Sequence, residues 1–500
     1  MRYAKIMRKS KDKTLRFLAK LNIAAIGLAF LGISCFLTFS KRPTVSSIES
    51  RTLEEYPKFT FSGYFSGEFN SGVQTWFTDT SPYRDGFKGV VVHIKGLFGV
   101  DTSLKVYVKD GGDTSSEDQR PSGEVSDPFE DYSRPAVQSE EPSRPQEESS
   151  AEQPSEEEPS GEEPSEEEPS QPPLNEFGVV DGGLLILGDR CMEAFGGTYS
   201  SGQLYAKYVS NFKKDLGGDV NVYSMVIPSA SSLYLTGDYY KTYGGEQIDK
   251  LKYINECFEN TGVKVVEIYD ILNSRKKEDI YYRTEHHWTP LGAYYAAKQL
   301  SLVAGTPFRE LFVPGTGSID EANYKYNGKF YSDGKPKPFL GSFYGETQSL
   351  VLKNNPETFF WYEYQGKYTF SQYKRDDYSK LIRTLDTCFL RISDDFISAW
   401  YMTYMDGDNY AVKIETDTPG GRVAVVFKDS FGNALVPMML SSYTTIYAVD
   451  IRYFKLDPID FIEKVGATDV LFSVSSFTAL GVNYKYIEKM RVMNTQKFGD

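Results

Sequence analysis

Apolar and polar positions change their spacing several times along the chain, and each change marks an element that can be predicted. Runs rich in apolar and β-branched residues predict strands at residues 221–227, 263–268, 422–427, 445–449 and 469–474. Helical stretches are predicted between them, at residues 247–260, 290–304 and 434–440. Strands that alternate with helices are typical of parallel βαβ units, so we expect an α/β layered core. Residues 305–417 are rich in Tyr and Gly and are expected to be less regular.

The longest apolar run covers residues 18–39, near the amino terminus. It is about as long as the roughly 20 residues that a helix needs to cross a bilayer. Basic residues precede it, and this excess places residues 1–17 in the cytoplasm and everything after Lys41 outside the cell. A cleaved signal peptide is the alternative, but the run is longer than a typical signal core and no A-x-A-like site follows it. We therefore expect a single-pass protein of the cell membrane with an extracellular carboxyl-terminal domain.

An acidic low-complexity segment covers residues 111–173 and ends in EQPSEEEPSGEEPSEEEPSQPP. Pro and like charge at this density leave too little apolar surface to offset the entropy of the chain. We predict a disordered, extended segment, which is either a stalk or an insertion between strand-like stretches at residues 105–110 and 179–190. Residues 40–110 would form the amino-terminal part of the ectodomain, and residues 174–500 its α/β domain.

The same segment accounts for the net charge of −14. Residues 110–176 contain 22 acidic and 3 basic residues, so the remainder of the chain carries a net +5, which the first 20 residues more than supply. The folded body is near neutral, so no nucleic-acid partner is expected.

The four cysteines show neither a CxxC pair nor a metal-ligand spacing. We interpret Cys191, Cys257 and Cys388 as buried small side chains, of which at most two could form a disulfide.

The chain has three histidines, and His286 and His287 are adjacent in the segment TEHHWTP. A His is the usual general base for a hydroxyl nucleophile, and a neighbouring carboxylate can fix its tautomer. On an extended loop, Glu285 and His287 would point to one side and His286 to the other, while Pro290 suits the first turn of a helix. A structural or surface histidine pair is the alternative. No metal site is expected, because adjacent side chains on a loop rarely bind one ion.

A second candidate lies at the end of the predicted strand 422–427, in the segment VAVVFKDSFGN. The apolar strand stops, Ser430 follows, and Gly432 lets the chain bend into a helix. The Ser430 hydroxyl would thus stand at the carboxyl end of a strand, beside backbone N–H groups that could stabilise an oxyanion. The alternative is that Ser430 only caps the following helix.

Together these segments resemble the DHHW family of Gram-positive bacterial proteins, which is similar to the SGNH-hydrolase-like O-acetyltransferases of alginate modification. The resemblance covers most of the chain outside the acidic segment. It rests on ESR from Glu49, FTDTSPYRD from Phe77, EHHWTPLGAYYAA from Glu285, DSFGNALVP from Asp429 and DIRY from Asp450. It implies an SGNH-hydrolase-like (flavodoxin-like) three-layer core with a mainly parallel sheet.

The resemblance also implies the residues of a site. In the family, an Asp-x-His-Trp segment supplies acid and base, and a later Asp-Ser turn supplies the nucleophile. By resemblance, Glu285 is the orienting carboxylate, His287 the base and Ser430 the nucleophile. Asn433 and Arg452 match segments near the family's site and are candidates for binding acyl or glycan oxygens.

Two departures from the family pattern bear on activity, because Glu285 replaces an expected Asp and Lys428 stands where many relatives have Gly.

We predict a membrane-anchored O-acyltransferase or esterase that acts on acetyl groups of a cell-surface or secreted polysaccharide. Its expected partners are that glycan, the membrane through residues 18–39, and a membrane protein that donates the acyl group. No cofactor is expected, because no nucleotide or dinucleotide motif is found. The alternative is a non-catalytic glycan-binding or polysaccharide-assembly protein on the same fold.

Overall fold

The computed structural model describes residues 27–28, 32, 36, 40–42, 45–46, 51–52, 55–82, 118–130, 179–180, 183–374 and 378–499. The chain divides into two compact units. The first contains Met1–Asp101 with Ser393–Ala399, and the second contains Thr102–Ile392 with Trp400–Asp500. Both segments of the candidate site fall in the second unit.

The described residues of the first unit include the strands β1 (Val45–Ser46) and β2 (Arg51–Thr52) and the helices α2 (Phe61–Ser66) and α3 (Glu68–Asp79). Gly67 separates the two helices with a φ of 85°, a left-handed conformation that Gly adopts readily. No helix of the described residues is long and apolar enough to cross a membrane. Most of residues 18–39 lie outside the described part of the chain, so the anchor stays a prediction.

An eight-stranded mixed sheet forms the centre of the second unit, in the order β13-β12-β14-β16-β15-β17-β6-β7. Its strands are β6 (Asn221–Ile227), β7 (Lys264–Val265), β12 (Tyr368–Lys374), β13 (Leu381–Leu385), β14 (Tyr410–Thr416), β15 (Val423–Lys428), β16 (Thr445–Asp450) and β17 (Asp469–Ser475). Strands β16, β15, β17, β6 and β7 pair in parallel. Strands β14, β12 and β13 extend the sheet by antiparallel pairing. The expected α/β fold with a large, mainly parallel sheet is confirmed, with an antiparallel extension at one edge.

The parallel strands are buried on both faces, which explains their nearly continuous apolar sequences. Every residue of β17 is buried. Phe427 of β15 and Phe472 of β17 pack on the same face, against Phe212 of the helix α5 (Tyr199–Leu216). Alternate residues of these strands face the opposite side, because successive side chains of a strand point to opposite faces.

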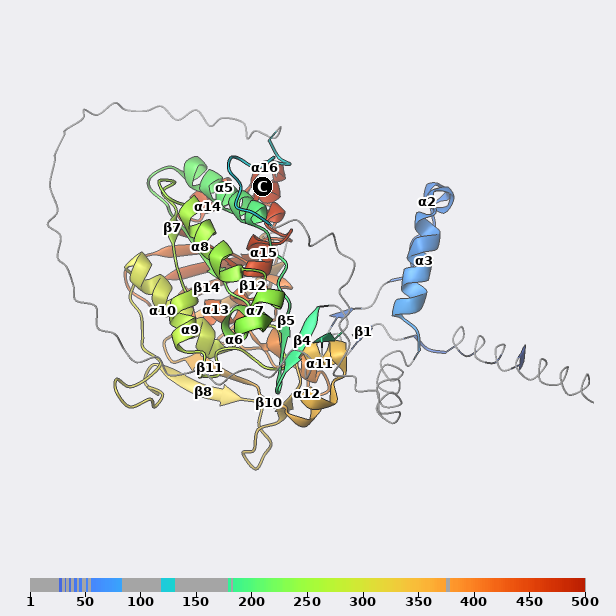
Figure 1. Ribbon diagram of the computed structural model, residues 1–500. Helices are drawn as coiled ribbons and strands as arrows, with labels where there is room; N and C mark the ends of the chain where they lie inside the picture. The colour runs from blue at the N-terminus through green and yellow to red at the C-terminus, as the bar shows by residue number, and fades with distance from the viewer. Residues whose placement is uncertain are drawn as a thin grey trace, which may run out of the picture. The chain divides into compact units, whose positions relative to one another are not determined.

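Helices cover both faces of the sheet. Besides α5, the second unit contains α6 (Ala230–Tyr234), α7 (Gly237–Tyr243), α8 (Gln247–Cys257), α9 (Tyr269–Ser274), α10 (Pro290–Ala304), α11 (Ser342–Thr347), α12 (Leu350–Asn354), α13 (Gly432–Leu435), the 3-10 helix η2 (Val436–Met439), α14 (Pro458–Lys464), α15 (Ser476–Ala479) and α16 (Lys485–Met493). Figure 1 shows α5, α14 and α16 on one side of the sheet and α9 and α10 on the other. Helices and sheet thus form three layers.

Most of the predicted strands and helices lie close to observed ones, with two differences. The strand predicted at residues 263–268 is reduced to the two residues of β7. The helix predicted at residues 434–440 is divided between α13 and η2.

Residues 305–417 are more regular than expected. They contribute β12, β13 and β14 to the main sheet, and they form two small antiparallel pairs, β8 (Tyr324–Gly328) with β11 (Phe360–Tyr364) and β9 (Pro338–Phe339) with β10 (Glu357–Thr358). The expectation of an irregular region is therefore wrong for these segments. Ser371 and Gln372 of β12 are buried, and buried polar residues interrupt the apolar pattern by which a strand is predicted.

A three-stranded antiparallel sheet confirms the strand character of residues 179–190. It consists of β3 (Val179–Val180), β4 (Leu184–Leu187) and β5 (Arg190–Glu193). The other strand-like stretch, residues 105–110, lies outside the described residues. Cys191 and Cys388 are buried and Cys257 is half-buried, and all three are free thiols, as expected for small packed side chains.

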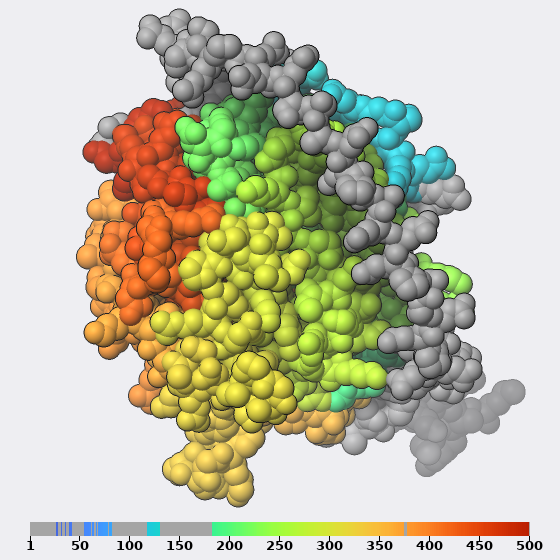
Figure 2. Space-filling model, turned by 90° about the vertical axis from the view of Figure 1, so that its left-hand side faces the viewer, coloured from blue at the N-terminus to red at the C-terminus, as the bar shows by residue number. Residues whose placement is uncertain are grey.

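Residues 118–130 belong to the segment predicted to be disordered, yet they pack against the core of the second unit, of which they are a part (Figure 2, cyan). Asp127 pairs with Lys207 of α5 at 2.9 Å, and Phe129 packs against the hydrophobic core. The prediction for residues 111–173 is wrong for this part. It was based on the average composition of the segment, which is acidic, whereas a few of its apolar residues and carboxylates have specific partners. For the remainder of the segment, which lies outside the described residues, it stays a prediction.

Candidate active site

Ser430 lies just beyond the carboxyl end of β15, on the turn that leads into α13. The adjacent Asp429 holds this turn in place. Its Oδ1 accepts a hydrogen bond from Phe431 N (3.1 Å). Its Oδ2 accepts from Ser475 N and Oγ (both 2.7 Å), at the end of β17, and from Thr478 Oγ1 (2.7 Å). Asp429 therefore joins the carboxyl ends of two adjacent parallel strands and leaves Ser430 half-buried at the surface.

The histidines lie on a tight loop directly before α10. An antiparallel bridge between Tyr281 and Trp288 closes this loop, and Thr289 caps the helix by accepting hydrogen bonds from its first turn. Glu357 of β10 accepts hydrogen bonds from the backbone N–H (2.6 Å) and the hydroxyl (2.7 Å) of Thr284. The loop is thus held by the sheet pair β9–β10 as well as by its own helix.

The histidine loop and the nucleophile turn meet, and a hydrogen-bonded chain links three of the predicted site residues. His287 Nε2 lies 2.8 Å from Ser430 Oγ, and His287 Nδ1 lies 2.8 Å from Glu285 Oε1. Both Glu285 and His287 are buried. Trp288 Nε1 donates to the carbonyl of Phe431 (2.9 Å), which ties the two segments together. The structure therefore brings Ser430, His287 and Glu285 together in the predicted order.

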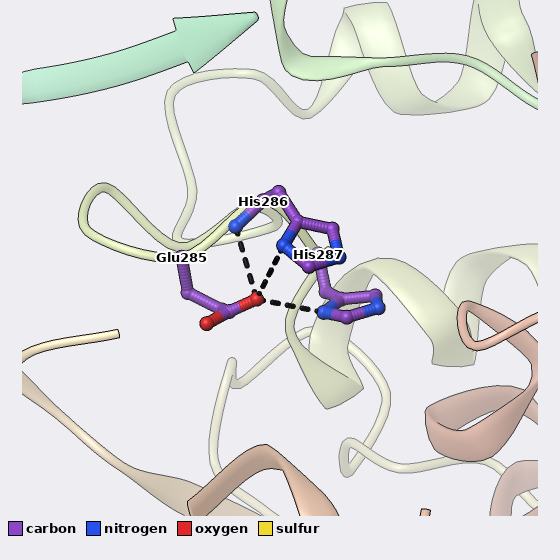
Figure 3. Close-up of side chains that lie close together, drawn as sticks. All are labelled: Glu285, His286 and His287. Carbon is purple, nitrogen blue, oxygen red and sulfur yellow. Dashed lines mark hydrogen bonds and ion pairs between the residues drawn. The ribbon is translucent and has the colours of Figure 1, made fainter. Parts of the chain in front are cut away.

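His286 does not face away from this group, so that part of the geometric prediction is wrong. Figure 3 shows both imidazoles turned toward the carboxylate of Glu285. His286 Nδ1 lies 2.9 Å from Glu285 Oε1, and the centroids of the two imidazole rings are 3.7 Å apart. The loop is bent rather than extended over these residues, so successive side chains need not alternate between two sides.

Burial and mutual interactions shift the pKa values of Glu285, His286 and His287 in different directions. Burial raises the pKa of Glu285, but the charge of His286 and hydrogen bonds from both histidines hold that pKa well below its usual range. Burial lowers the pKa of His287, and the charge of His286 lowers it further, to about 4. Burial also opposes a charge on His286, but Glu285 outweighs it and raises the pKa of His286 to about 9. The pKa values of the two histidines are thus shifted in opposite directions, upward for His286 and downward for His287.

Tyr401 packs flat against the ring of His287, with centroids 3.7 Å apart and ring planes 4° from parallel. Its hydroxyl donates to the carbonyl oxygen of Ser430 (3.4 Å). The backbone N–H of Ser430 makes no hydrogen bond within the part of the chain that the structure describes, so it is available to an oxyanion. Sequence reasoning missed Tyr401, because nothing local distinguishes one Tyr in a Tyr-rich region.

Asn433 and Arg452 belong to a charged network beside the site, centred on Asp408. Asp408 Oδ1 accepts a hydrogen bond from Asn433 Nδ2 (2.9 Å), and Oδ2 accepts from Arg452 Nη2 (2.7 Å). Arg452 also forms an ion pair with Asp450 (2.5 Å). Both predicted binding residues thus contact Asp408, and their contacts with acyl or glycan oxygens stay a prediction.

Asp408 also explains how Lys428 is accommodated at the end of β15. The Lys428 side chain is 2% exposed, and its Nζ lies 3.3 Å from Asp408 Oδ1. Burial raises the pKa of Asp408, but the charges of Lys428 and Arg452 lower it to about 2, so the carboxylate stays charged. Sequence reasoning missed Asp408, since an Asp in a Gly-Asp-Asn turn is typical of an exposed loop.

Arg452 also lines a cavity of about 780 Å³ in the second unit. The lining residues include four Lys or Arg side chains and three Tyr side chains, and none of them is acidic. Its wall is formed in part by Tyr410, Tyr453, Lys455, Tyr486 and Lys489. Arg452 therefore connects the cavity, through Asp408 and Asn433, with the turn that carries Ser430.

A family model described as DHHW protein matches residues 49–449. The chain belongs to the DHHW family. A solved DHHW family protein from Eubacterium siraeum is 33% identical to it, with a TM-score of 0.54 over 64% of this chain and 98% of the other. Further similar structures are PatB1 of Bacillus cereus (20% identity, TM-score 0.46, 62% and 98% covered) and the O-acetyltransferase domain of Pseudomonas putida AlgJ (13%, 0.33, 62% and 96%). No curated protein sequence matches the chain.

In this DHHW family member, the EHHW loop packs closely against the start of α11. Ser342 N donates to Glu285 Oε2 (2.6 Å), and Gly341 N donates to Thr284 Oγ1 (3.0 Å). A Cβ atom at residue 341 would lie only 2.4 Å from the Cβ of Glu285. The loop can approach this closely only because residue 341 has no side chain.

The same DHHW loop offers ligand atoms of the kind that bind metal ions. One atom each of Glu285, His286 and His287 lie within 4.8 Å of one another. These atoms already form hydrogen bonds and ion pairs with one another, which accounts for their spacing. We assign them as hydrogen-bonding groups rather than metal ligands, and the expected absence of a metal stays a prediction.

Proposed function

We propose that the chain is a serine-dependent carbohydrate O-acetyltransferase or acetylesterase with an SGNH-like fold. It is anchored in the cell membrane by residues 18–39 and acts outside the cell on acetyl groups of a cell-surface or secreted polysaccharide. The observation that carries the proposal is the hydrogen-bonded chain Ser430–His287–Glu285, with 2.8 Å at each link. Side chains in this order form an acyl-transfer site that recurs on unrelated folds.

The reaction begins when Ser430 Oγ attacks the acetyl carbonyl carbon and its proton passes to His287 Nε2. Glu285 Oε1 accepts a hydrogen bond from His287 Nδ1–H, which fixes the tautomer and stabilises the imidazolium. The carbonyl oxygen becomes an oxyanion beside the Ser430 N–H. The ester C–O bond then breaks, and the leaving oxygen takes the proton from His287, which leaves an acetyl group on Ser430.

The acetyl-enzyme is discharged by the reverse steps. A sugar hydroxyl gives its proton to His287 and attacks the acetyl carbon, which restores Ser430 and yields the acetylated glycan. Water in the same role yields acetate, so transfer and hydrolysis differ only in the acceptor. The Tyr-lined and Lys-lined cavity at Arg452 is suited to hold the glycan, since Tyr presents an apolar face with a polar edge. The acetyl donor would reach the site from a partner protein in the membrane.

Turnover of an aryl acetate by the purified full-length protein tests the proposal. The wild type is expected to release the phenol and to gain the mass of one acetyl group on Ser430, whereas Ser430→Ala should do neither. Ser274→Ala is a matched control, because Ser274 is exposed and lies at the end of α9. If the wild type turns over neither aryl acetates nor acetylated sugars, and Ser430→Ala keeps its cellular function, the proposal is refuted.

A non-catalytic glycan-binding or polysaccharide-assembly protein is the second candidate. The cavity favours it as much as it favours an enzyme, because binding a glycan there does not require Ser430. In that case polysaccharide binding would survive Ser430→Ala, and no acetyl-enzyme would form.

The proposed topology has its own test: protease added outside intact cells should remove the mass beyond Lys41, and protection of that mass would refute the topology.

A further inference from the structure

His286 forms polar contacts with Glu285 and Ser342 as well as a ring contact with His287. Its Nδ1 lies 2.9 Å from both Glu285 Oε1 and Ser342 Oγ. Its backbone N–H donates to the same Glu285 oxygen (3.1 Å), and its ring lies 3.7 Å from that of His287. Two imidazoles therefore share one carboxylate oxygen (Figure 3). Of the two, His287 is hydrogen-bonded to Ser430.

We propose that His286 is a positioning residue that carries the resting positive charge of the site, pairs with Glu285, and so keeps His287 neutral and ready to accept a proton. The role in turnover rests on the proposed function. The charge on His286 does not, and it can be measured in a protein that has no activity.

The first argument is the spacing of the rings. Two imidazolium ions with centroids 3.7 Å apart would repel strongly in a site that is largely closed to water. Glu285 is the carboxylate within hydrogen-bond distance of both rings, and its single negative charge balances one positive charge and not two. The pair of histidines therefore holds one extra proton in the resting state, and the question is which ring carries it.

The second argument is the difference in exposure. The side chain of His286 is 31% exposed and that of His287 is 6% exposed, so a charge on His286 keeps more of its hydration. His287 is also covered by the ring of Tyr401. Hydration thus favours the proton on His286.

The third argument is the set of charged groups around each ring. Besides Glu285, the carboxylates of Glu193 on β5 and Glu346 on α11 act on His286, and both raise its pKa. Asp408 acts on His287 in the same direction, whereas burial is the largest influence there and lowers the pKa of His287. Three carboxylates therefore favour the charged form of His286.

Position and charge can be separated by two substitutions at one residue. His286→Asn keeps an N–H donor for Glu285 but has no charge, whereas His286→Ala loses both. Ser342→Ala is a control that removes the hydroxyl contact of His286 and leaves its charge in place.

The decisive experiment is a titration by nuclear magnetic resonance of the full-length protein with nitrogen-15 in histidine only. The chain has three histidines, and His93→Gln identifies the signal of the third, His93. In the wild type, His286 should stay protonated at neutral pH while His287 is neutral. In His286→Asn, the pKa of His287 should rise by about one unit or more, since the neighbouring cation is gone. Ser342→Ala should leave it unchanged.

The proposal is overturned if wild-type His287 is the protonated ring at neutral pH, or if His286→Asn leaves the titration of His287 in place. The wild-type titration decides this even if a variant fails to fold.

Where turnover is measurable, the acid limb of kcat/KM should move to higher pH in His286→Asn and His286→Ala. The His286→Asn variant should keep much of the rate that the His286→Ala variant loses. A rate loss that is equal at all pH values would show a structural role only. If turnover is absent but the titration is as expected, the proposed function fails and the charge assignment stands.

Discussion

Gly341→Ala is the sharpest test of the site geometry, because it changes only the space beside Glu285. Gly341 has a φ of −75°, which Ala adopts without strain, so the backbone itself does not resist the substitution. The added Cβ would lie 2.4 Å from Glu285 Cβ, 2.7 Å from its Oε2 and 2.8 Å from its Cα. Since ordinary contact begins at 3.4 Å, the EHHW loop or the start of α11 must move by about 1 Å.

A displacement of this size should be visible mainly in the reaction. A misplacement of about 1 Å at a catalytic group can cost roughly 100-fold in rate, so we expect kcat/KM for an aryl acetate to fall by about that factor. Overpacking of a buried position costs about 1–3 kcal/mol, so the variant should still fold. The loss should fall mainly on kcat, because the carboxylate acts on His287 and not on the substrate.

The measurement compares initial rates and urea unfolding of the full-length wild type, Gly341→Ala and the control Gly218→Ala. Gly218 is exposed and has no atom within 4 Å of an added Cβ, so its substitution should change neither quantity. A Gly341→Ala protein that is folded and fully active would refute the close approach of residue 341 to Glu285.

Three further predictions follow from the site. Ser430→Ala/His287→Ala should be hardly slower than either single variant in ester turnover, because the two side chains act as a unit; additive losses would contradict the hydrogen-bonded chain. Asp408→Ala should destabilise the protein by roughly 3 kcal/mol in urea unfolding, since Lys428 would be left as a buried charge with one partner fewer. Lys428→Met should cost about 1 kcal/mol or less, because it leaves no such charge; equal costs of the two substitutions would contradict this explanation. Incubation with EDTA followed by gel filtration should leave turnover unchanged, and a loss restored by added Zn²⁺ would show that the EHHW group binds a metal ion.

The parts of the fold that were predictable are those with strong local patterns. The parallel strands β6, β15, β16 and β17 are continuous apolar runs, because both of their faces are covered. The start of α10 is marked by Thr289 and Pro290, a cap followed by a residue with a suitable φ. Such signals depend on neighbours in sequence and need no knowledge of the tertiary structure.

The antiparallel extension of the sheet was missed for the opposite reason. In β12, Gln372 is fully buried and donates to the carbonyl of Met405 (3.1 Å), a partner that only the tertiary structure supplies. In β13, most residues are exposed or half-buried, as expected at the edge of a sheet. Neither strand shows the apolar alternation that sequence reasoning depends on.

For the site, the chemistry of the two segments could be predicted from their residues alone: a Ser at the end of an apolar strand, and an imidazole pair with a carboxylate just before a helix. How these groups are arranged depends on the packing of distant elements. Ser430 and His287 are 143 residues apart, and they meet because β15 ends beside the loop that precedes α10. The bend of that loop turns His286 toward Glu285, and Asp408 reaches Lys428 from a distant turn. Local patterns encode periodicity and capping, whereas contacts across such separations depend on the order in which strands and helices pack.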